Sequence, residues 1–556
     1  MIYTLKNFFF RIYYFVVKII IKYVIKDKSL MLKNIPFDRY EVYNNINENK
    51  TFNYKTILPY IDLDELNISN IYKPYEILET LIIESNSEEN IKFKGTNEFV
   101  LPIAILNKNR SKIEETDHIV IEYGKSKSNI EIKYKNRFHY LPIKSTSEVY
   151  KVNIKSSTNK LAVGKPIFKA QRGIKNTSKL IVHIFVDAFA QSLIDKFGYE
   201  IIPNTKKYFE KNGVIFKNAY AQAEWTLSSI AGIFTGKYTH EHLIYHPRSG
   251  DKIKHTTLAD AMQKEGYLTF ACTNIPKLTP VNGFDKGFDR YISAIDRNYN
   301  YIINEACEQL DTFGGKQYLF LGFFDLHEAH RLQPISSQVL NDLKDFQYKK
   351  LKGNSKDTSI LYDEERINML KSSVTHFDKK LQRLFDEIDK YDQNALVVMH
   401  SDHGVNFMSK TEELLAKERE KVVFLFKNNK KHIVNNTIKE IRELPSMITN
   451  ALKIDNVFEY KSKDYAITES LYPNKEYEVA VRNEKYVLFF KVLWEDVKNR
   501  NVLTYIPKTS FHYIDKEEIE VDFNYLNNKD YLSLLDIAEN CFIKISNKLI
   551  EKEKYL

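Results

Sequence analysis

Cysteine is scarce in this sequence, with three residues among 556. Cys272, Cys307 and Cys541 lie far apart and form neither a metal-binding pair nor a disulfide framework, which favours a reducing compartment. The sequence also has no long basic run with interleaved aromatic residues, although its net charge is +9, from 82 basic and 73 acidic residues. These absences argue against a disulfide-stabilised domain and against a nucleic-acid-binding protein. The mild positive excess suits an anionic substrate or an anionic membrane surface.

The amino terminus lacks an uninterrupted apolar run and a small-residue cleavage site. Residues 5–26 read "LKNFFFRIYYFVVKIIIKYVIK", in which Arg11, Lys18 and Lys22 fall on one helical face. This pattern predicts a basic amphipathic helix lying in the interface of an anionic membrane, and it argues against a removable signal peptide. If the helix crossed the bilayer, the lysines that follow it would keep the body of the protein in the cytoplasm. We therefore expect a membrane-associated protein on the cytoplasmic face; the alternative is a helix packed on the protein's own core.

The length predicts two or three units. Residues 1–30 form the predicted membrane-associating helix, and residues 31–170 show short alternating runs such as "HIVIEYG" that predict a β-rich accessory domain. In residues 171–455, continuous apolar runs such as "LIVHIFVD" alternate with helical segments. This pattern predicts an α/β domain whose buried parallel sheet is flanked by helices and binds ligands at the carboxyl ends of its strands. Residues 456–556 return to strand-like runs before a final helix, which predicts a small α+β subdomain.

Polar residues follow three of the predicted strands. Asp187 ends "LIVHIFVD", Asp402 and His403 follow "ALVVMHS", and Asp325 and His327 follow "YLFLGFF". A single acid at a strand end is commonly a turn or cap residue. Carboxylates and an imidazole at neighbouring strand ends, however, are suited to a divalent cation.

The stretch "QAEWTLSSIAGIFTG", residues 222–236, places Thr226 at the start of a short helix made of small residues. The amino-terminal end of a helix can hold a nucleophile that attacks an anionic group. Thr is also an ordinary helix cap. The strand-end acids favour the nucleophile.

Several stretches in this order resemble the sulfatase-like branch of the alkaline phosphatase superfamily, from about residue 179 to 485. They include "VHIFVDAFA", "WTLSSIAGIFTGKYTHEH", "FFDLHEAH" and "VVMHSDHG". The resemblance implies a sulfatase-like α/β sheet and one divalent metal ion, with Mn, Mg, Ca and Zn left open. It also implies that the metal ligands are Asp187, Thr226, Asp402 and His403.

Two departures from the sulfatase pattern concern the nucleophile. Sulfatases carry Cys or Ser in a C/S-x-P-x-R motif, whereas this chain has Thr226 followed by Leu, Ser, Ser and Ile230. Ala188 also follows Asp187, where many sulfatases have a second acid. The remaining ligand set is similar to that of lipoteichoic acid synthases and phosphoethanolamine transferases, which use a Thr nucleophile. Those enzymes have several transmembrane spans and act outside the cell, so their substrate and location are not transferred to this chain.

The expected chemistry is metal-dependent transfer of a phosphoryl-linked group through a phosphothreonine at Thr226. The substrate is expected to be an anionic ester, onto or from a glycan or lipid-linked cell-envelope precursor. His327 and His330 would donate to the ester oxygens or the leaving group. Alternatively, Asp325, His327 and His330 would hold a second metal.

Three other questions stay open at this stage. His242 and His246 either line the cleft or are plain surface residues. The same site would serve a sulfuric ester or phosphodiester hydrolase. A member of another functional class, an inactive protein that binds a partner through its β-rich domain, is the second alternative.

Overall fold

The computed structural model describes most of the chain, in segments separated by gaps. These segments are residue 16 and residues 41–44, 51–60, 74–94, 98–106, 117–123, 126–132, 136–144, 149–156, 159–169, 180–246, 252–295, 297–327, 362–428, 431–458, 460, 463–471, 476–493, 507–521 and 528–553. The predicted membrane helix at residues 5–26 lies outside them, apart from Val16. Among the described helices, none is long and apolar enough to cross a membrane.

A parallel sheet forms the centre of the molecule, in the order β16-β15-β17-β12-β18, and it continues through antiparallel β19 to β13. Strands β12, β17 and β18 are buried along their whole length. The continuous apolar runs read from the sequence are therefore strands covered on both faces, as predicted. The bounds are β12 (Leu180–Val186), β13 (Gly213–Phe216), β15 (Leu268–Thr273), β16 (Arg290–Ser293), β17 (Gln317–Phe323), β18 (Leu396–His400) and β19 (Phe424–Lys427).

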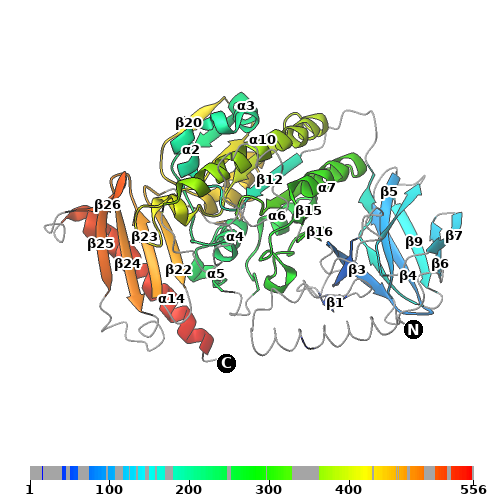
Figure 1. Cartoon of the computed structure of the whole chain (residues 1–556). Helices are drawn as coiled ribbons and strands as arrows, with labels where there is room; N and C mark the ends of the chain where they lie inside the picture. Colours follow the sequence, from blue (N-terminus) through cyan, green and yellow to red (C-terminus); the bar gives the residue numbers. More distant parts are fainter. Residues whose placement is uncertain are drawn as a thin grey trace.

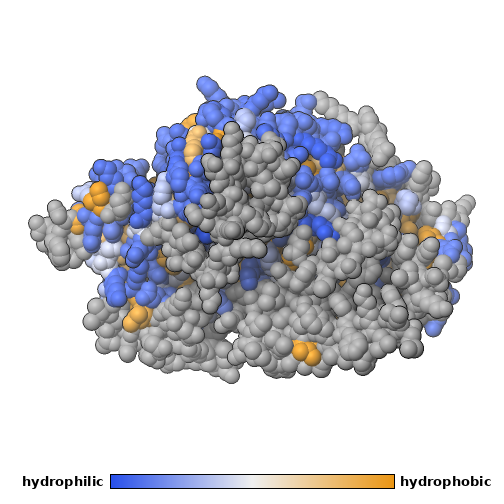
Figure 2. Space-filling view, in the orientation of Figure 1, coloured by the Kyte–Doolittle hydropathy of each residue, from blue (hydrophilic) through white to orange (hydrophobic). Residues whose placement is uncertain are grey.

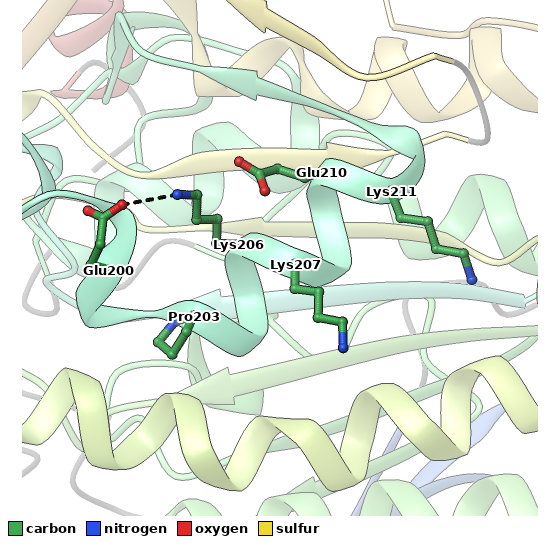
Figure 3. A pocket seen from close by; sticks show the side chains of 6 residues that line it. All are labelled: Glu200, Pro203, Lys206, Lys207, Glu210 and Lys211. Atoms are coloured by element: carbon green, nitrogen blue, oxygen red, sulfur yellow. Dashed lines mark hydrogen bonds and ion pairs between the residues drawn. The ribbon is translucent and has the colours of Figure 1, made fainter.

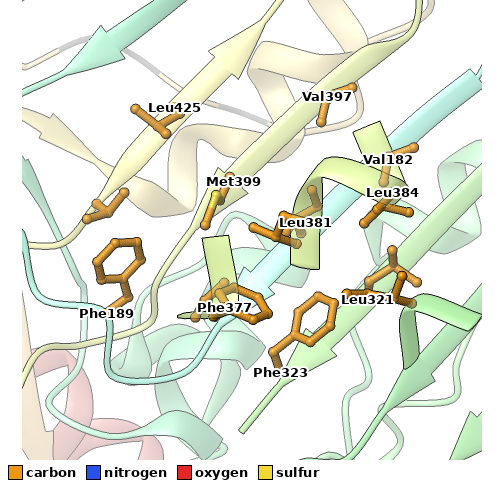
Figure 4. Close-up of a cluster of buried hydrophobic side chains, with 14 of the residues drawn as sticks. Val182, Phe189, Leu321, Phe323, Phe377, Leu381, Leu384, Val397, Met399 and Leu425 are labelled. Atoms are coloured by element: carbon orange, nitrogen blue, oxygen red, sulfur yellow. The ribbon is translucent and has the colours of Figure 1, made fainter. Parts of the chain in front are cut away.

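Helices cover both faces of this sheet (Figure 1). One face packs against α3 (Pro203–Asn212), α7 (Tyr299–Thr312) and α10 (Glu364–Tyr391), and the other against α4 (Thr226–Thr235), α6 (Leu258–Lys264) and α12 (Leu444–Leu452). Successive residues of β12 face opposite sides, so Val182 packs with the first group and Ile181 with the second. Figure 4 shows Phe377, Leu381 and Leu384 of α10 packed among strand residues of the first face.

The β-rich amino-terminal part extends the central sheet. β3 (Tyr75–Ile83) pairs antiparallel with β16, and β10, β5 and β11 follow it in one 15-stranded sheet. Strands β4, β9, β6 and β7 form a separate antiparallel sheet. The bounds are β1 (Glu41–Asn44), β2 (Tyr54–Pro59), β4 (Glu88–Lys94), β5 (Glu98–Leu106), β6 (Asp117–Tyr123), β7 (Ser126–Ile132), β8 (His139–Lys144), β9 (Val149–Ser156), β10 (Lys160–Gly164) and β11 (Ile167–Phe168).

The carboxyl-terminal part is an antiparallel sheet of five strands packed on one long helix, α14 (Lys529–Glu553), which matches the predicted α+β subdomain. Figure 1 shows it on the side of the central sheet away from the amino-terminal strands. Its strands are β22 (Ala466–Leu471), β23 (Glu476–Arg482), β24 (Tyr486–Leu493), β25 (Lys508–Tyr513) and β26 (Lys516–Glu520).

Hydrophilic residues cover most of the described surface in Figure 2, and hydrophobic ones are scattered in small groups. Figure 3 shows a hollow beside α3 that is lined by Glu200, Pro203, Lys206, Lys207, Glu210 and Lys211. Lys206 pairs with Glu200 across it at 3.0 Å. The hollow contains none of the strand-end residues predicted to carry the chemistry.

A buried ion pair lies where the amino-terminal strands join the central parallel sheet. Arg290 of β16 donates through Nε to Glu76 of β3 at 2.6 Å and through Nη1 to Gln309 at 2.9 Å. The rings of Tyr140 and Phe270 lie 5.5 and 5.2 Å from its guanidinium carbon. Both charged side chains are nearly inaccessible to solvent, so each depends on the other for its charge to be balanced.

Arg290→Met should destabilise the protein by about 3–5 kcal/mol, because it leaves the Glu76 charge buried without its partner. Urea unfolding followed by circular dichroism measures the loss. The matched control is Lys169→Gln, which removes an exposed pair with Glu98 at 3.1 Å and should cost about 0–1 kcal/mol. Equal losses for the two variants would contradict the assignment of Arg290 as the charge that secures this junction.

Candidate active site

The carboxyl ends of three strands meet at one edge of the sheet. β12 lies between β17 and β18 and pairs in parallel with both, with Val186 opposite Phe323 and Phe185 opposite His400. The residues that follow these strands are therefore neighbours, as predicted. Asp187, His327 and His403 come from the three different strand ends, and one potential ligand atom from each lies within 4.8 Å of the others.

Thr226 is the first residue of α4, and its side chain points toward this edge. Trp225, in an extended conformation, is the residue that precedes the helix, and no side chain caps α4. The Thr226 hydroxyl donates to Asp187 Oδ2 at 3.2 Å and lies 3.4 Å from His403 Nε2. Thr226 is thus no helix cap: its hydroxyl contacts the strand-end residues.

Close packing around α4 explains why its residues are small. All ten residues of the helix are buried. A Cβ at Gly232 would lie 2.5 Å from the side-chain amide nitrogen of Gln222, so any larger residue there would displace the Gln222 side chain from the helix. Ser229 donates to the backbone oxygen of Asp402 at 2.9 Å. These contacts bring the start of α4 against the residues that follow β18.

The hydrogen bonds of His403 and Asp402 leave acceptor atoms facing Thr226. His403 Nδ1 lies 2.8 Å from the Gly404 carbonyl and donates to it, so its Nε2 carries the lone pair. Burial, with a smaller contribution from the charge of Arg419, lowers the pKa of His403 to about 3, and its imidazole is neutral at physiological pH. Asp402 Oδ1 accepts from the backbone nitrogens of Ala188 and His403 at 3.2 and 2.9 Å. Its Oδ2 is buried without a hydrogen-bond donor among the described residues and lies 3.4 Å from His403 Nε2.

This group of acceptors fits a divalent cation. Ligands bound about 2.1 Å from one tetrahedral ion lie about 3.4 Å from one another. His403 Nε2 lies 3.4 Å from both Asp402 Oδ2 and Thr226 Oγ1, and 3.8 Å from Asp187 Oδ1. A neutral imidazole between two carboxylates in a buried site is electrostatically unfavourable without a cation. The structure therefore contains a possible Asp/His metal site at Asp187, His327 and His403, and the predicted ligand set of Asp187, Thr226, Asp402 and His403 stays a prediction that these distances support.

Of the other predicted residues, the structure brings His327 to the site but not Asp325. His327 Nε2 lies 3.9 Å from Asp187 Oδ1, and its ring stacks on Phe324 at 4.9 Å. Asp325 instead accepts from Asn274 Nδ2 at 2.8 Å and from the backbone nitrogen of Tyr299 at 3.0 Å, at the start of α7. This carboxylate is thus engaged at a helix terminus, and the alternative of a second metal held by Asp325, His327 and His330 stays a prediction. His330 lies outside the described residues.

His242 and His246 both lie close to α4, and neither is a plain surface residue. His242 accepts from the backbone nitrogen of Ile244 at 3.0 Å, and burial lowers its pKa to about 3. The ring of His246 is 5.9 Å from that of Trp225, next to Thr226. His246 is therefore the better candidate of the two for a cleft residue.

Sequence reasoning missed two residues that hold this edge together. Ser401 accepts from the backbone nitrogen of Phe189 at 2.8 Å and donates to the backbone oxygen of His403 at 2.8 Å. It therefore connects the loops that carry Asp187 and Asp402. Ala188 adopts a φ of 61°, which is strained for a residue other than glycine, and this conformation aims its N–H at Asp402. The "SDHG" stretch contains the only local signal, a Ser directly before the Asp.

Comparison with known proteins agrees with this geometry. Residues 179–439 match the family model described as Sulfatase, which supports, for this part of the chain, the sulfatase-like resemblance carried by its motifs. A comparison with curated proteins finds no match. The assignment to the Thr-nucleophile group named above stays an inference from residues.

Three solved structures illustrate the similarity in fold. A Bacteroides thetaiotaomicron structure from work on the metabolism of multiple glycosaminoglycans has a TM-score of 0.51 and 12% identity, covering 66% of this chain and 96% of that chain. The putative sulfatase yidJ from Bacteroides fragilis gives 0.49 and 14%, covering 68% and 97%. The phosphonate monoester hydrolase of Agrobacterium radiobacter gives 0.48 and 12%, covering 66% and 96%. At these identities the first of them establishes the fold and nothing about substrate.

Two fully buried histidines lie beneath the site on neighbouring strands. His183 of β12 and His400 of β18 approach at 2.5 Å between their Nε2 atoms. His183 Nδ1 lies 3.0 Å from the Tyr318 hydroxyl, and His400 Nδ1 lies 2.9 Å from the backbone oxygen of Ser401. One neutral tautomer of each ring satisfies every one of these contacts, with a single proton between the two Nε2 atoms.

Stability should fall as the pH drops from about 6.5 toward 4, because burial lowers the pKa of His400 to about 4 and also that of His183. Below the ordinary pKa of 6.5 the unfolded chain binds protons that the folded chain does not, so stability rises with pH in this window. For His400, a pKa shift of this size corresponds to roughly 3 kcal/mol of unfolding free energy. Denaturant unfolding at several pH values measures the slope.

The matched variant is His183→Phe with His400→Phe, which removes both titrating rings from the core. Its unfolding free energy should depend less on pH between 6.5 and 4 than that of the natural chain. An unchanged slope in the double variant would assign the acid sensitivity to other groups.

Proposed function

We propose that this chain is a metal-dependent phosphoester transferase that uses Thr226 as its nucleophile. The observation that carries the proposal is the position of the Thr226 hydroxyl, which contacts both Asp187 and His403 at the amino-terminal end of a buried helix. In the first step the Thr226 oxygen forms a bond to phosphorus and the bond to the leaving oxygen breaks. An acceptor alcohol then attacks the phosphothreonine and releases Thr226.

The residues of the site have separate tasks in this scheme. Asp187 accepts the Thr226 hydrogen bond and orients the oxygen, while Asp402 and His403 complete the group that would hold the metal with Asp187 and Thr226. When bound, a divalent cation lowers the pKa of a hydroxyl and neutralises developing charge. His327, on the exposed side of Asp187, donates a proton to the leaving oxygen.

Phosphorus suits this nucleophile better than sulfur. Thr226 carries one hydroxyl, so a sulfothreonine could be released only by attack at sulfur, whereas the geminal diol of formylglycine expels sulfate by C–O cleavage. The position of the sulfatase-motif Arg is occupied by Ile230, which is fully buried in α4. A phosphothreonine can be resolved by an activated alcohol or by water.

A hydrolase with the same site is the second candidate. The family match to residues 179–439 favours it, because that family is described as Sulfatase. The two candidates differ only in the second acceptor, water or an alcohol. The acceptor of the transferase is proposed to be a glycan or a lipid-linked cell-envelope precursor.

The test is a side-by-side assay of an aryl phosphate, an aryl phosphodiester and an aryl sulfate, with Mn, Mg, Ca and Zn supplied in turn. We expect the phosphoesters to be preferred and Thr226→Ala to lose turnover by several orders of magnitude while staying folded. Intact mass after incubation identifies the group added to Thr226. Asp325→Asn is the control for loss of a nearby carboxylate and should keep its metal affinity. Preference for the sulfate, or full activity of Thr226→Ala, would refute the phosphoryl mechanism.

We also propose that residues 5–26 attach the protein to the cytoplasmic face of an anionic membrane. The basis is the basic amphipathic pattern of the sequence. Deleting residues 1–28 should move the protein from vesicles containing anionic lipid to the soluble fraction, and high salt should weaken binding by the full chain. Vesicles of neutral lipid are the control. Equal sedimentation of the truncated and full chains would show that this segment packs on the protein itself.

A further inference from the structure

A backbone hydrogen bond fixes Arg419 beside the candidate metal ligands. The Gly404 nitrogen donates to the Arg419 carbonyl at 2.5 Å, directly after His403. A Cβ at Gly404 would lie 2.8 Å from Ala190 Cβ and closer still to the carbonyl oxygen of Glu418, so this approach requires glycine. The segment that carries Arg419, α11 (Lys417–Glu420), is therefore fixed against the loop after β18.

The guanidinium of Arg419 lies between the two segments that form the site. Its Nε donates to the carbonyl of Glu224 at 3.1 Å, two residues before Thr226, and its Nη1 donates to Asn406. A guanidinium has five N–H donors in a fixed plane. Two of them hold the group in place, and three remain for a ligand.

Arg419 differs from the other buried arginines in its counter-charge. Arg290, Arg442 and Arg482 each have a carboxylate oxygen within 2.6–3.1 Å. In the part of the chain that the structure describes, no carboxylate lies within ion-pair distance of the half-buried Arg419 guanidinium. Its charge nevertheless acts on His403, whose pKa it helps to lower. The same charge acts on the buried carboxyls of Glu420 and Glu224, where it opposes the rise in pKa that burial causes, but it forms no direct pair with either. A positioned guanidinium whose remaining N–H donors are not taken by a carboxylate is suited to bind an anion beside it.

We propose that Arg419 binds a non-bridging oxygen of the phosphoryl group that Thr226 attacks, and so selects for anionic esters at this site. This inference rests on the proposed function. The guanidinium forms charge-assisted hydrogen bonds to the substrate through the donors not used by Glu224 and Asn406. The contacts also allow a second role, in which Arg419 only holds Glu224 and Asn406 in place. That role predicts different results in the experiments below.

The first experiment measures binding of inorganic phosphate to the metal-loaded full chain by isothermal titration calorimetry. Arg419→Gln should weaken phosphate binding about 10- to 100-fold, the size expected for loss of a charged hydrogen bond, and Arg419→Lys should keep part of the affinity. The control is Lys421→Gln in the same segment, whose amine pairs with Asp195 at 3.0 Å. It should bind phosphate like the natural chain.

Metal affinity and thermal unfolding of the same variants show whether Arg419 binds the anion or only holds the neighbouring segments in place. Arg419→Gln should keep the metal affinity and the unfolding temperature of the natural chain, because its proposed partner is the anion. Unchanged phosphate binding in Arg419→Gln would overturn the inference. So would a parallel loss of metal and phosphate affinity, since that result identifies a brace for the metal ligands.

Turnover of the aryl phosphodiester distinguishes this inference from the proposed function. If Thr226→Ala abolishes turnover but Arg419→Gln has the KM and kcat of the natural chain, the function stands and the role of Arg419 fails. If phosphate binding depends on Arg419 but no phosphoester is turned over, the anion site stands and the proposed reaction fails.

Discussion

The parallel pairing of β12 with β17 and β18 places three acceptor groups closer together than they would lie in water. Asp187, Asp402 and the neutral His403 converge in a buried space where lone pairs repel one another. Backbone N–H groups of Ala188 and His403 hold one Asp402 oxygen and leave the other directed at the imidazole. Only a cation balances this arrangement without protonating it. The strained turn at Ala188 and the hydrogen bonds of Ser401 serve the same purpose, because both hold the loops that carry Asp187 and Asp402 in fixed positions relative to each other.

Thr226 is held against this group of acceptors by close packing. Ser229 of α4 bonds to the backbone of Asp402, and Gly232 allows Gln222 to lie against the helix. Gly404 allows the Arg419 segment to approach from the other side. Gly232 and Gly404 thus allow α4, the loop after β18 and the Arg419 segment to meet near Thr226. Larger residues at either position would push these segments apart. This explains why the helix that begins at Thr226 has so little bulk.

The sequence contained enough information for the strands and for the residues at their ends, because continuous apolar runs report burial on both faces and polar residues mark where they stop. It could not show which strand pairs with the edge of the sheet. The antiparallel joining of β3 to β16, with Arg290 buried at the junction, depends on contacts more than 200 residues apart in the chain. Asp325 has the same strand-end position as Asp187, but its partners Asn274 and Tyr299 come from distant segments. Arg419 belongs to no motif, and only the structure shows that its guanidinium forms no direct pair with a carboxylate among the described residues.

Charge and nucleophile select the substrate in different ways. In the proposed metal-bound site, two carboxylates and a divalent cation would sum to zero and the neutral His403 would add nothing. The positive charge of Arg419, which also acts on the buried carboxyls of Glu224 and Glu420, would then face the substrate. That charge favours a singly charged ester and does not distinguish a phosphodiester from a sulfate monoester. In the proposed mechanism that distinction would fall to Thr226. Its single hydroxyl offers a sulfated intermediate no C–O cleavage route, whereas attack of the acceptor at phosphorus would break the phosphothreonine P–O bond and free Thr226. The anion selection proposed for Arg419 and the phosphorus selection proposed for Thr226 would therefore be independent, and together they would define a smaller set of substrates than either residue alone.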